Sequence, residues 1–239
     1  MLDVSTVFGM VREQCEDEGD VSPERLLHQL SDMVGIEHFT YLRINTEGQL
    51  EDATESTYSD EWQNRYISGN YQLIDPVVQI GLKSALPIDW SQLTADDPAI
   101  RDFFGEAAEF GVSSQGLTIP IRDAQGRRAL FSINSNMSAS EFGRYTNDFR
   151  SDIHYLGYLF HEHSCRNSQF EVPCVPLSSR EQGVLFWAAR GKTAKETGLI
   201  LDLKESTVKF YTHNAAAKLG ASNKTHAVAK AIGMGIITL

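Results

Sequence analysis

The sequence predicts an α+β protein in two parts. The first is an N-terminal α/β/α sandwich whose central antiparallel sheet encloses a ligand pocket, and the second is an all-α unit of four short helices. Up to about residue 166, segments rich in β-branched and aromatic residues alternate with amphipathic helical patterns, which favours helices packed on a sheet. From residue 177 only helical patterns remain, separated by short turns. A chain of 239 residues is long enough for two cores, so we expect domains at 1–166 and 177–239 with a linker at 167–176.

The elements of the sandwich follow from local patterns. Ser22 before Pro23 is a typical helix start, because serine caps free N–H groups and proline suits the first turn. Gly35 ends this helix, and a segment rich in β-formers follows. The expected helices are 3–17, 23–35, 60–69, 75–82, 96–110 and 138–164. The expected strands are 38–45, a second one through residue 57, 115–122 and 128–136, with a short extended piece at 87–90.

The helical unit has clear start and stop signals. Ser178 or Ser179 can cap its first helix, and Gly191 can end it. The second helix should run from about 193 to 201 with Leu199 and Ile200 turned inward. The third is expected over about 206–219, and the fourth begins near residue 223.

The second and third helices, joined by the tight turn 202–204, are typical of a helix-turn-helix, whose second helix lies in the DNA major groove. At about 100° per residue, the core side of this helix carries Val208, Tyr211, Ala215 and Leu219. The other side carries Ser206, Lys209 and His213, and it either contacts DNA or is an ordinary solvated face. Charge favours DNA: the net charge is +5 from Val175 onward and −16 over the rest of a chain whose total is −11.

A set of residues distributed over the whole helical unit resembles the DNA-binding domain of the LuxR family of transcription regulators. They are Leu177, Arg180-Glu181, Val184-Leu185, Gly191-Lys192-Thr193, Glu196, Ile200-Leu201, Thr207-Val208-Lys209-Phe210, Asn214, Lys218-Leu219-Gly220 and Asn223-Lys224. Three departures are Gly183 for an acidic residue, Thr197-Gly198 for Ile-Ala, and Tyr211 for His. A glycine inside a helix costs about 1 kcal/mol relative to alanine, so Gly198 is expected to loosen the unit.

The resemblance implies roles for these residues and partners for the chain. Lys209 and His213 match positions that contact base edges, with Ser206 and Thr207 beside them. Phosphate contacts are expected from Lys192, Lys204, Lys218 and Lys224. A homodimer on a palindromic site in double-stranded DNA is implied, together with RNA polymerase as a partner.

In the sandwich, aromatic residues gather around one carboxylate. They are Tyr58, Trp62, Tyr66, Tyr71, Asp75-Pro76, Trp90 and Phe103-Phe104. Large apolar rings with a few polar atoms suit a small molecule with an amide head and an apolar tail. The alternative is a plain aromatic core in which Asp75 only caps the helix that begins at Pro76.

The spacing of Trp62, Tyr66, Asp75 and Pro76, with Trp90 and Gly116 further on, is similar to the autoinducer-binding domain of the same family, which binds N-acyl-homoserine lactones. The resemblance implies that Trp62 donates to the lactone carbonyl and that Asp75 accepts the amide N–H. Tyr58 and Ser132 would serve the amide carbonyl, and Tyr66 and Trp90 would wall the head group. The acyl chain would lie among Val78, Phe103, Leu117 and Leu42.

Other classes of protein fit less well. A phosphorylation-controlled receiver domain needs a βα alternation that the first half lacks, and a lactone-modifying enzyme needs a metal motif or nucleophile. The cluster of His154, His161, Glu162, His163 and Cys165 has irregular spacing for metal ligands, so no cofactor is expected. A regulator that needs no ligand, or one tuned to a non-fatty acyl group, stays open.

Composition places the chain in a cellular compartment. Three cysteines without metal spacing predict a reduced, cytoplasmic setting. No stretch approaches the roughly 18 apolar residues of a membrane span.

Overall fold

The computed structural model describes residues 6, 9–13, 21–44, 50–93, 97–123, 127–167 and 176–238. The chain divides into two compact units, one containing Met1–Ile121 and Arg128–Gln169 and the other containing Phe170–Leu239. Most of the expected linker and of the expected helix over 3–17 lies outside the described residues, although residues 6 and 9–13 are helical. Within the described part, no helix is both long and apolar enough to cross a membrane.

The first unit is a three-layer sandwich around a five-stranded sheet of order β2-β1-β5-β4-β3. The strands are β1 (His38–Ile44), β2 (Leu50–Ser56), β3 (Ile88–Asp89), β4 (Gly116–Arg122) and β5 (Arg128–Asn134). Antiparallel pairing joins β1 to β2 and to β5, and β3 to β4. This architecture confirms the predicted α/β/α sandwich.

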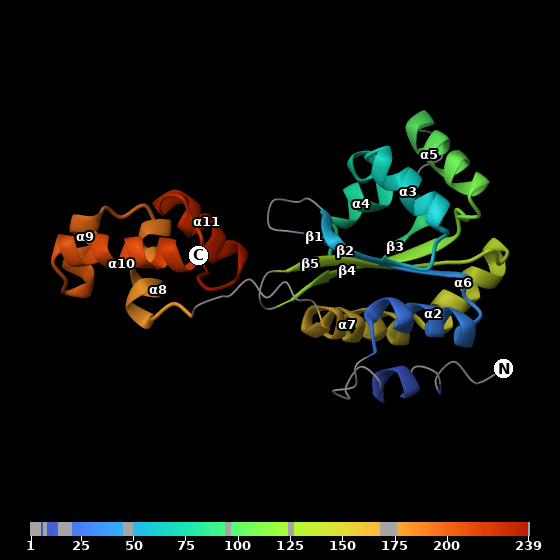
Figure 1. Ribbon diagram of the computed structural model, residues 1–239, viewed down its shortest axis with the longest axis horizontal. Helices are drawn as coiled ribbons and strands as arrows, with labels where there is room; N and C mark the ends of the chain where they lie inside the picture. Colours follow the sequence, from blue (N-terminus) through green and yellow to red (C-terminus); the bar gives the residue numbers. More distant parts are fainter. Residues whose placement is uncertain are drawn as a thin grey trace. The chain divides into compact units, whose positions relative to one another are not determined.

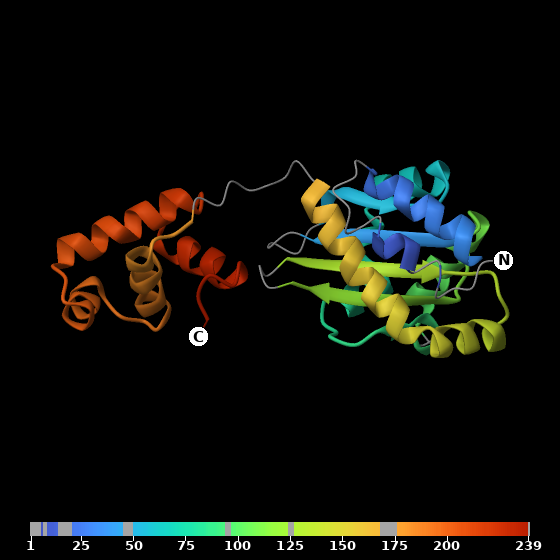
Figure 2. The same cartoon turned by 90° about the horizontal axis from the view of Figure 1, so that it is seen from below.

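The two helical layers lie on opposite faces of the sheet (Figure 1). One layer consists of α2 (Pro23–Val34), α6 (Ala139–Asp148) and α7 (Arg150–Asn167), and α7 runs along this face beside α2 (Figure 2). The other consists of α3 (Asp60–Ser68), α4 (Pro76–Gly81) and α5 (Pro98–Glu109), with short 3-10 turns η1 (Tyr71–Leu73) and η2 (Trp90–Gln92).

Strand residues alternate between these layers because successive side chains in a strand point to opposite faces. Phe39 and Tyr41 of β1 and Phe131 of β5 belong to the main core with α2 and α7. Thr40 of β1 and Ser132 of β5 face the layer of α3, α4 and α5, where they line a cavity. The sheet therefore separates the main core from a more polar space.

The single helix expected over 138–164 is wrong, because the structure has two helices that meet at Phe149. The backbone of Phe149 (φ −111°, ψ 17°) leaves the helical region. Asn147 and Asp148 precede it, and such side chains compete for backbone hydrogen bonds and weaken a helix. The Asn147 side chain accepts a hydrogen bond from Arg150 across the break (3.0 Å).

The second unit contains α8 (Ser179–Ala189), α9 (Ala194–Leu201), α10 (Glu205–Lys218) and α11 (Lys224–Gly233). Capping boxes start α8 at Ser178 and α9 at Thr193, as each cap exchanges hydrogen bonds with a glutamate three residues on. A left-handed Asp202 (φ 55°) ends α9 and turns the chain into α10. The predicted four-helix unit with a helix-turn-helix is thus confirmed.

The inward face of α9 differs from the expectation. Leu199 is 79% exposed and Ile200 is 44% exposed, whereas Thr197 and Gly198 are buried. Positions 194, 197, 198 and 201 form the stripe that helical spacing turns to the core, so spacing outweighs apolar character here. Residues 199 and 200 lie outside that stripe.

Gly198 tightens the turn instead of loosening it. A Cβ at this position would lie 2.5 Å from the Leu203 carbonyl oxygen, and that carbonyl belongs to the α9–α10 turn. The amide of Leu203 in turn donates to the Gly198 carbonyl at 2.8 Å. The expected penalty relative to alanine is therefore corrected, because alanine does not fit this contact.

Candidate ligand cavity and DNA-binding surface

A cavity of about 340 Å³ lies in the sandwich between the sheet and the layer of α3, α4 and α5. Eight of the ten residues expected around the ligand line it: Tyr58, Trp62, Tyr66, Asp75, Trp90, Phe103, Ser132 and Leu42. The remaining lining residues are Thr40, Ser56, Gln63, Ile67, Gln72, Val77, Phe104 and Val112. Of these, only Phe104 belongs to the aromatic group that the sequence gathers around Asp75.

Val78 and Leu117 do not line the cavity, so their assignment to the acyl chain is corrected. Val78 packs in a separate cluster with Ile44 and Leu130. Leu117 belongs to the main core on the opposite face of the sheet. Its neighbour Thr118 has its hydroxyl on the cavity face, and alternation along β4 turns Leu117 away.

Asp75 both caps a helix and faces the cavity, so the two interpretations of this residue are compatible. One carboxylate oxygen accepts from the backbone N–H of Val77 at 2.8 Å and of Val78 at 3.4 Å at the start of α4. The other accepts from the Tyr66 hydroxyl at 2.8 Å. Burial raises the pKa of Asp75 to about 6, against these hydrogen bonds, which lower it.

Two residues with an unused hydrogen-bond donor line the cavity together with Asp75. Among the described residues, neither the Trp62 indole N–H nor the Tyr58 hydroxyl has a hydrogen-bond partner, and both residues line the cavity. Burial, with the nearby Asp75 charge, raises the pKa of the Tyr58 hydroxyl, so it stays protonated and able to donate. The cavity thus presents two donors and one carboxylate within largely apolar walls.

The Trp62 ring is fixed by other aromatic rings. It stacks on Tyr71 (centroids 5.8 Å apart) and contacts Phe103 and Phe110. The Tyr71 hydroxyl donates to Glu106 of α5, and Glu106 also accepts from Arg65 of α3 at 2.6 Å. These contacts tie α3, η1 and α5 together and hold the indole in place.

Trp90 forms a second wall. Its indole N–H donates to the Thr118 hydroxyl at 2.8 Å, so this donor is not offered to a ligand. Its ring lies against Gly116, where a Cβ would fall 2.3 Å from the ring. Thr118 in turn lies 2.8 Å from the Ser132 hydroxyl. Because Thr118 already accepts from Trp90, it can donate to Ser132, which frees the Ser132 proton to donate into the cavity.

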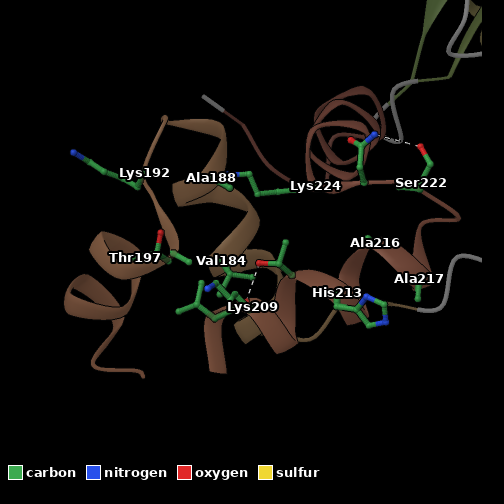
Figure 3. A pocket seen from close by; sticks show the side chains of 15 residues that line it. Val184, Ala188, Lys192, Thr197, Lys209, His213, Ala216, Ala217, Ser222 and Lys224 are labelled. Atoms are coloured by element: carbon green, nitrogen blue, oxygen red, sulfur yellow. Dashed lines mark hydrogen bonds between the residues drawn. The ribbon is translucent and has the colours of Figure 1, made fainter. Parts of the chain in front are cut away.

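The helix-turn-helix unit has a hollow of about 600 Å³ bordered by cationic side chains. Lys192 precedes α9, Lys209 and His213 lie on α10, and Lys224 begins α11 (Figure 3). Glu205 forms an ion pair with Lys209 at 2.6 Å, one turn away on the exposed face of α10. The hollow thus collects four of the eight predicted DNA-contacting residues from three parts of the unit.

The other four predicted residues lie outside this hollow. Lys204 and Ser206 are exposed at the start of α10, and Thr207 is half-buried. Lys218 is different, because its ammonium donates to the buried Glu181 carboxylate at 2.8 Å. It also donates to the Pro176 carbonyl at 3.4 Å. Lys218 therefore joins α10 to the start of α8, and its contact with a DNA phosphate stays a prediction.

Phe210 was not singled out as a contact residue, although its side chain is 59% exposed on α10. It follows Lys209 and lies one turn before His213, so it shares their exposed side at helical spacing. The signal in the sequence was its position: Phe210 is a large apolar residue that lies outside the core side of this helix, which Val208, Tyr211, Ala215 and Leu219 form.

Two histidines of α7 have partners within the protein. The His161 ring nitrogen lies 2.7 Å from the Tyr41 hydroxyl, and the His163 ring nitrogen lies 2.9 Å from the Val21 carbonyl. Within the part of the chain that the structure describes, no three histidine, cysteine or acidic side chains converge as metal ligands.

A cavity with an aromatic and carboxylate lining, joined in one chain to a helix-turn-helix with a cationic surface, defines a ligand-responsive transcription regulator. Comparison with known families agrees: residues 24–164 match the autoinducer-binding domain, and residues 175–231 match the bacterial regulatory proteins of the luxR family. The chain belongs to the LuxR family of autoinducer-binding transcription regulators, which are not enzymes.

Individual relatives span both units. The transcriptional activator protein VanR of Vibrio anguillarum is 30% identical over 97% of each chain. RaiR of Rhizobium etli, also a transcriptional activator protein, is 34% identical over 76% of this chain and 78% of its own. The crystal structure of Escherichia coli SdiA shares the fold with a TM-score of 0.75 at 19% identity, covering 99% of this chain and all of SdiA.

Proposed function

We propose that this protein binds an N-acyl-homoserine lactone in the sandwich cavity and thereby controls quorum-sensing genes. The observation that supports the proposal is that Asp75 lines one cavity with Trp62, whose indole N–H has no hydrogen-bond partner among the described residues. A lactone carbonyl accepts from the first, and the neighbouring amide N–H donates to the second. Tyr58 and Ser132 supply donors for the amide carbonyl, and about 340 Å³ lies within the usual range of small-molecule pockets.

The proposal extends to DNA. A bound lactone completes the sandwich core and stabilises the folded protein by mass action. The regulator acts as a homodimer in the cytoplasm, and its two α10 helices enter successive major grooves of a palindromic promoter site. There it activates transcription together with RNA polymerase. Lys209 and His213 read bases, whereas Lys192, Lys204 and Lys224 hold phosphates.

The test is thermal unfolding of the purified protein with a panel of acyl-homoserine lactones that differ in chain length. One or a few compounds should raise the unfolding temperature and tighten binding to a palindromic operator. Asp75→Asn keeps the size of the side chain but removes its charge, and it should remove the response while the helix-turn-helix stays folded. Normal dose–response curves for Asp75→Asn would contradict the proposed site.

The panel also separates this proposal from its alternative. If no fatty acyl lactone shifts the unfolding temperature while DNA binding is intact, the regulator is ligand-independent or tuned to a non-fatty acyl group. Aryl and branched acyl lactones belong in the panel for that reason.

A further inference from the structure

The cavity floor contains a row of hydroxyl groups that crosses the sheet. Thr40 on β1 is the direct cross-strand partner of Ser56 on β2 and of Ser132 on β5. All three line the cavity, and all three are more than 90% buried. Cross-strand partners have Cβ atoms about 5 Å apart, so the hydroxyls lie side by side. Thr118 on β4 extends the row through its 2.8 Å contact with Ser132.

Part of the hydrogen-bonding capacity of this row is unused. The Thr40 hydroxyl has no hydrogen-bond partner among the described residues, although its residue is only 7% exposed. The Ser56 oxygen accepts from the backbone N–H of Tyr58 at 3.1 Å, but its own proton has no acceptor in the described part of the chain. Neither hydroxyl is among the fully enclosed polar atoms without a partner in the described part of the chain, so both groups are open to the cavity and can hydrogen-bond a polar partner there.

We propose that Thr40 and Ser56 bind an oxygen substituent, a hydroxyl or keto group, on the acyl chain close to the amide. This inference rests on the proposed function. In the proposed function, Ser132 donates to the amide carbonyl. Thr40 is the partner of Ser132 on the next strand, so the first carbons of the acyl chain pass over Thr40. Two residues further along β1 the floor becomes apolar at Leu42, which suits the rest of the chain.

The chemistry of the row favours such a substituent over a plain methylene. An unsubstituted chain that covers Thr40 removes water from the hydroxyl and gives no hydrogen bond in return. A keto oxygen accepts from Thr40 or Ser56, and a hydroxyl can also donate to Thr40. Sites built to hydrogen-bond a substituent discriminate against the analogue that lacks it. We expect a preference of about tenfold, which corresponds to about 1.4 kcal/mol.

The test compares three lactones of equal chain length, with an unsubstituted, a 3-oxo and a 3-hydroxy acyl group, by titration calorimetry on the full chain. The wild type should bind at least one oxygenated compound about tenfold more tightly than the unsubstituted one. Thr40→Val keeps the shape but removes the hydroxyl, and the ratio of affinities should fall towards one. Thr146→Val is the matched control, because the Thr146 hydroxyl bonds to the Phe142 carbonyl within α6 (3.0 Å), and it should keep the wild-type ratio.

Two results would overturn the inference. Equal or tighter binding of the unsubstituted lactone by the wild type would mean that water satisfies the hydroxyl row. An unchanged ratio in Thr40→Val would assign the preference to other groups. The chain length is the one that gives the largest rise in unfolding temperature in the lactone panel. If no member of that panel binds, the proposed function itself fails, and this inference fails with it.

Discussion

Gly198 offers a sharp test of the helix-turn-helix geometry, because two physical effects on Gly198→Ala have opposite signs. Helix propensity alone predicts that alanine stabilises α9 by about 1 kcal/mol. The structure places the new Cβ 2.5 Å from the Leu203 carbonyl oxygen, and this backbone atom cannot move without opening the turn. Overpacking of this kind costs about 1–3 kcal/mol, which exceeds the gain from propensity, so we expect a net loss of up to roughly 2 kcal/mol in the unfolding free energy of this unit.

Gly183→Ala is the matched control. Gly183 lies inside α8, and its added Cβ would meet only the Leu201 side chain at an ordinary 3.7 Å. Helix propensity should therefore dominate, and the unfolding free energy of the unit should rise by about 1 kcal/mol in this variant. Hydrogen–deuterium exchange of amides in α9 and α10 of the full chain measures both changes. Slower exchange in Gly198→Ala, as in Gly183→Ala, would refute the close approach of Gly198 to the turn.

Three further predictions concern charge. The pKa of Asp75 is raised to about 6, mainly by burial, so lactone affinity should fall as the pH drops through 6 and the acceptor becomes protonated; calorimetry between pH 5 and 8 checks this. Burial opposes ionisation of Glu181, but the Lys218 and Ser178 hydrogen bonds outweigh it and lower its pKa. This carboxylate therefore stabilises the fold at neutral pH, and its contribution is lost as the pH falls through the lowered pKa. Lys218→Ala should destabilise the helical unit by about 2–3 kcal/mol in exchange experiments, below the usual 3–5 for a buried pair because Lys218 is partly exposed. Lys209→Ala should weaken operator binding and relax base preference, whereas Lys224→Ala should weaken binding to all sequences alike, as competition assays would reveal.

Much of the architecture could be predicted from the sequence because its signals are local. Ser178 with Glu181 predicts a helix start, and so does Ser22 with Pro23. Neither prediction requires knowledge of the rest of the chain. Apart from the break at Phe149, which divides the helix expected over 138–164, the errors concern the orientation of side chains. Leu199 has the chemistry of a core residue, but the packing of α9 on α10 decides which stripe faces inward.

The composition of the cavity depended on contacts between distant segments. Trp62 and Asp75 could be assigned to it from their spacing, through the family resemblance. Thr40 and Ser56 could not, because their alignment depends on the register between β1 and β2. Lys218 carries a charge that suits phosphate, and only the fold brings Glu181 to it. The contacts of Thr40, Ser56 and Lys218 follow from their positions in the tertiary structure, and residue type alone does not predict them.

The most direct test of the account is the nuclear magnetic resonance signal of the Trp62 indole N–H during titration with a lactone that binds. The chain has three tryptophans, so the indole signals can be assigned with Trp62→Phe as reference. The Trp62 signal should move downfield as its N–H gains the lactone carbonyl, while that of Trp187, in the DNA-binding unit, should change little. A lactone that binds tightly and leaves the Trp62 signal in place would contradict the proposed site.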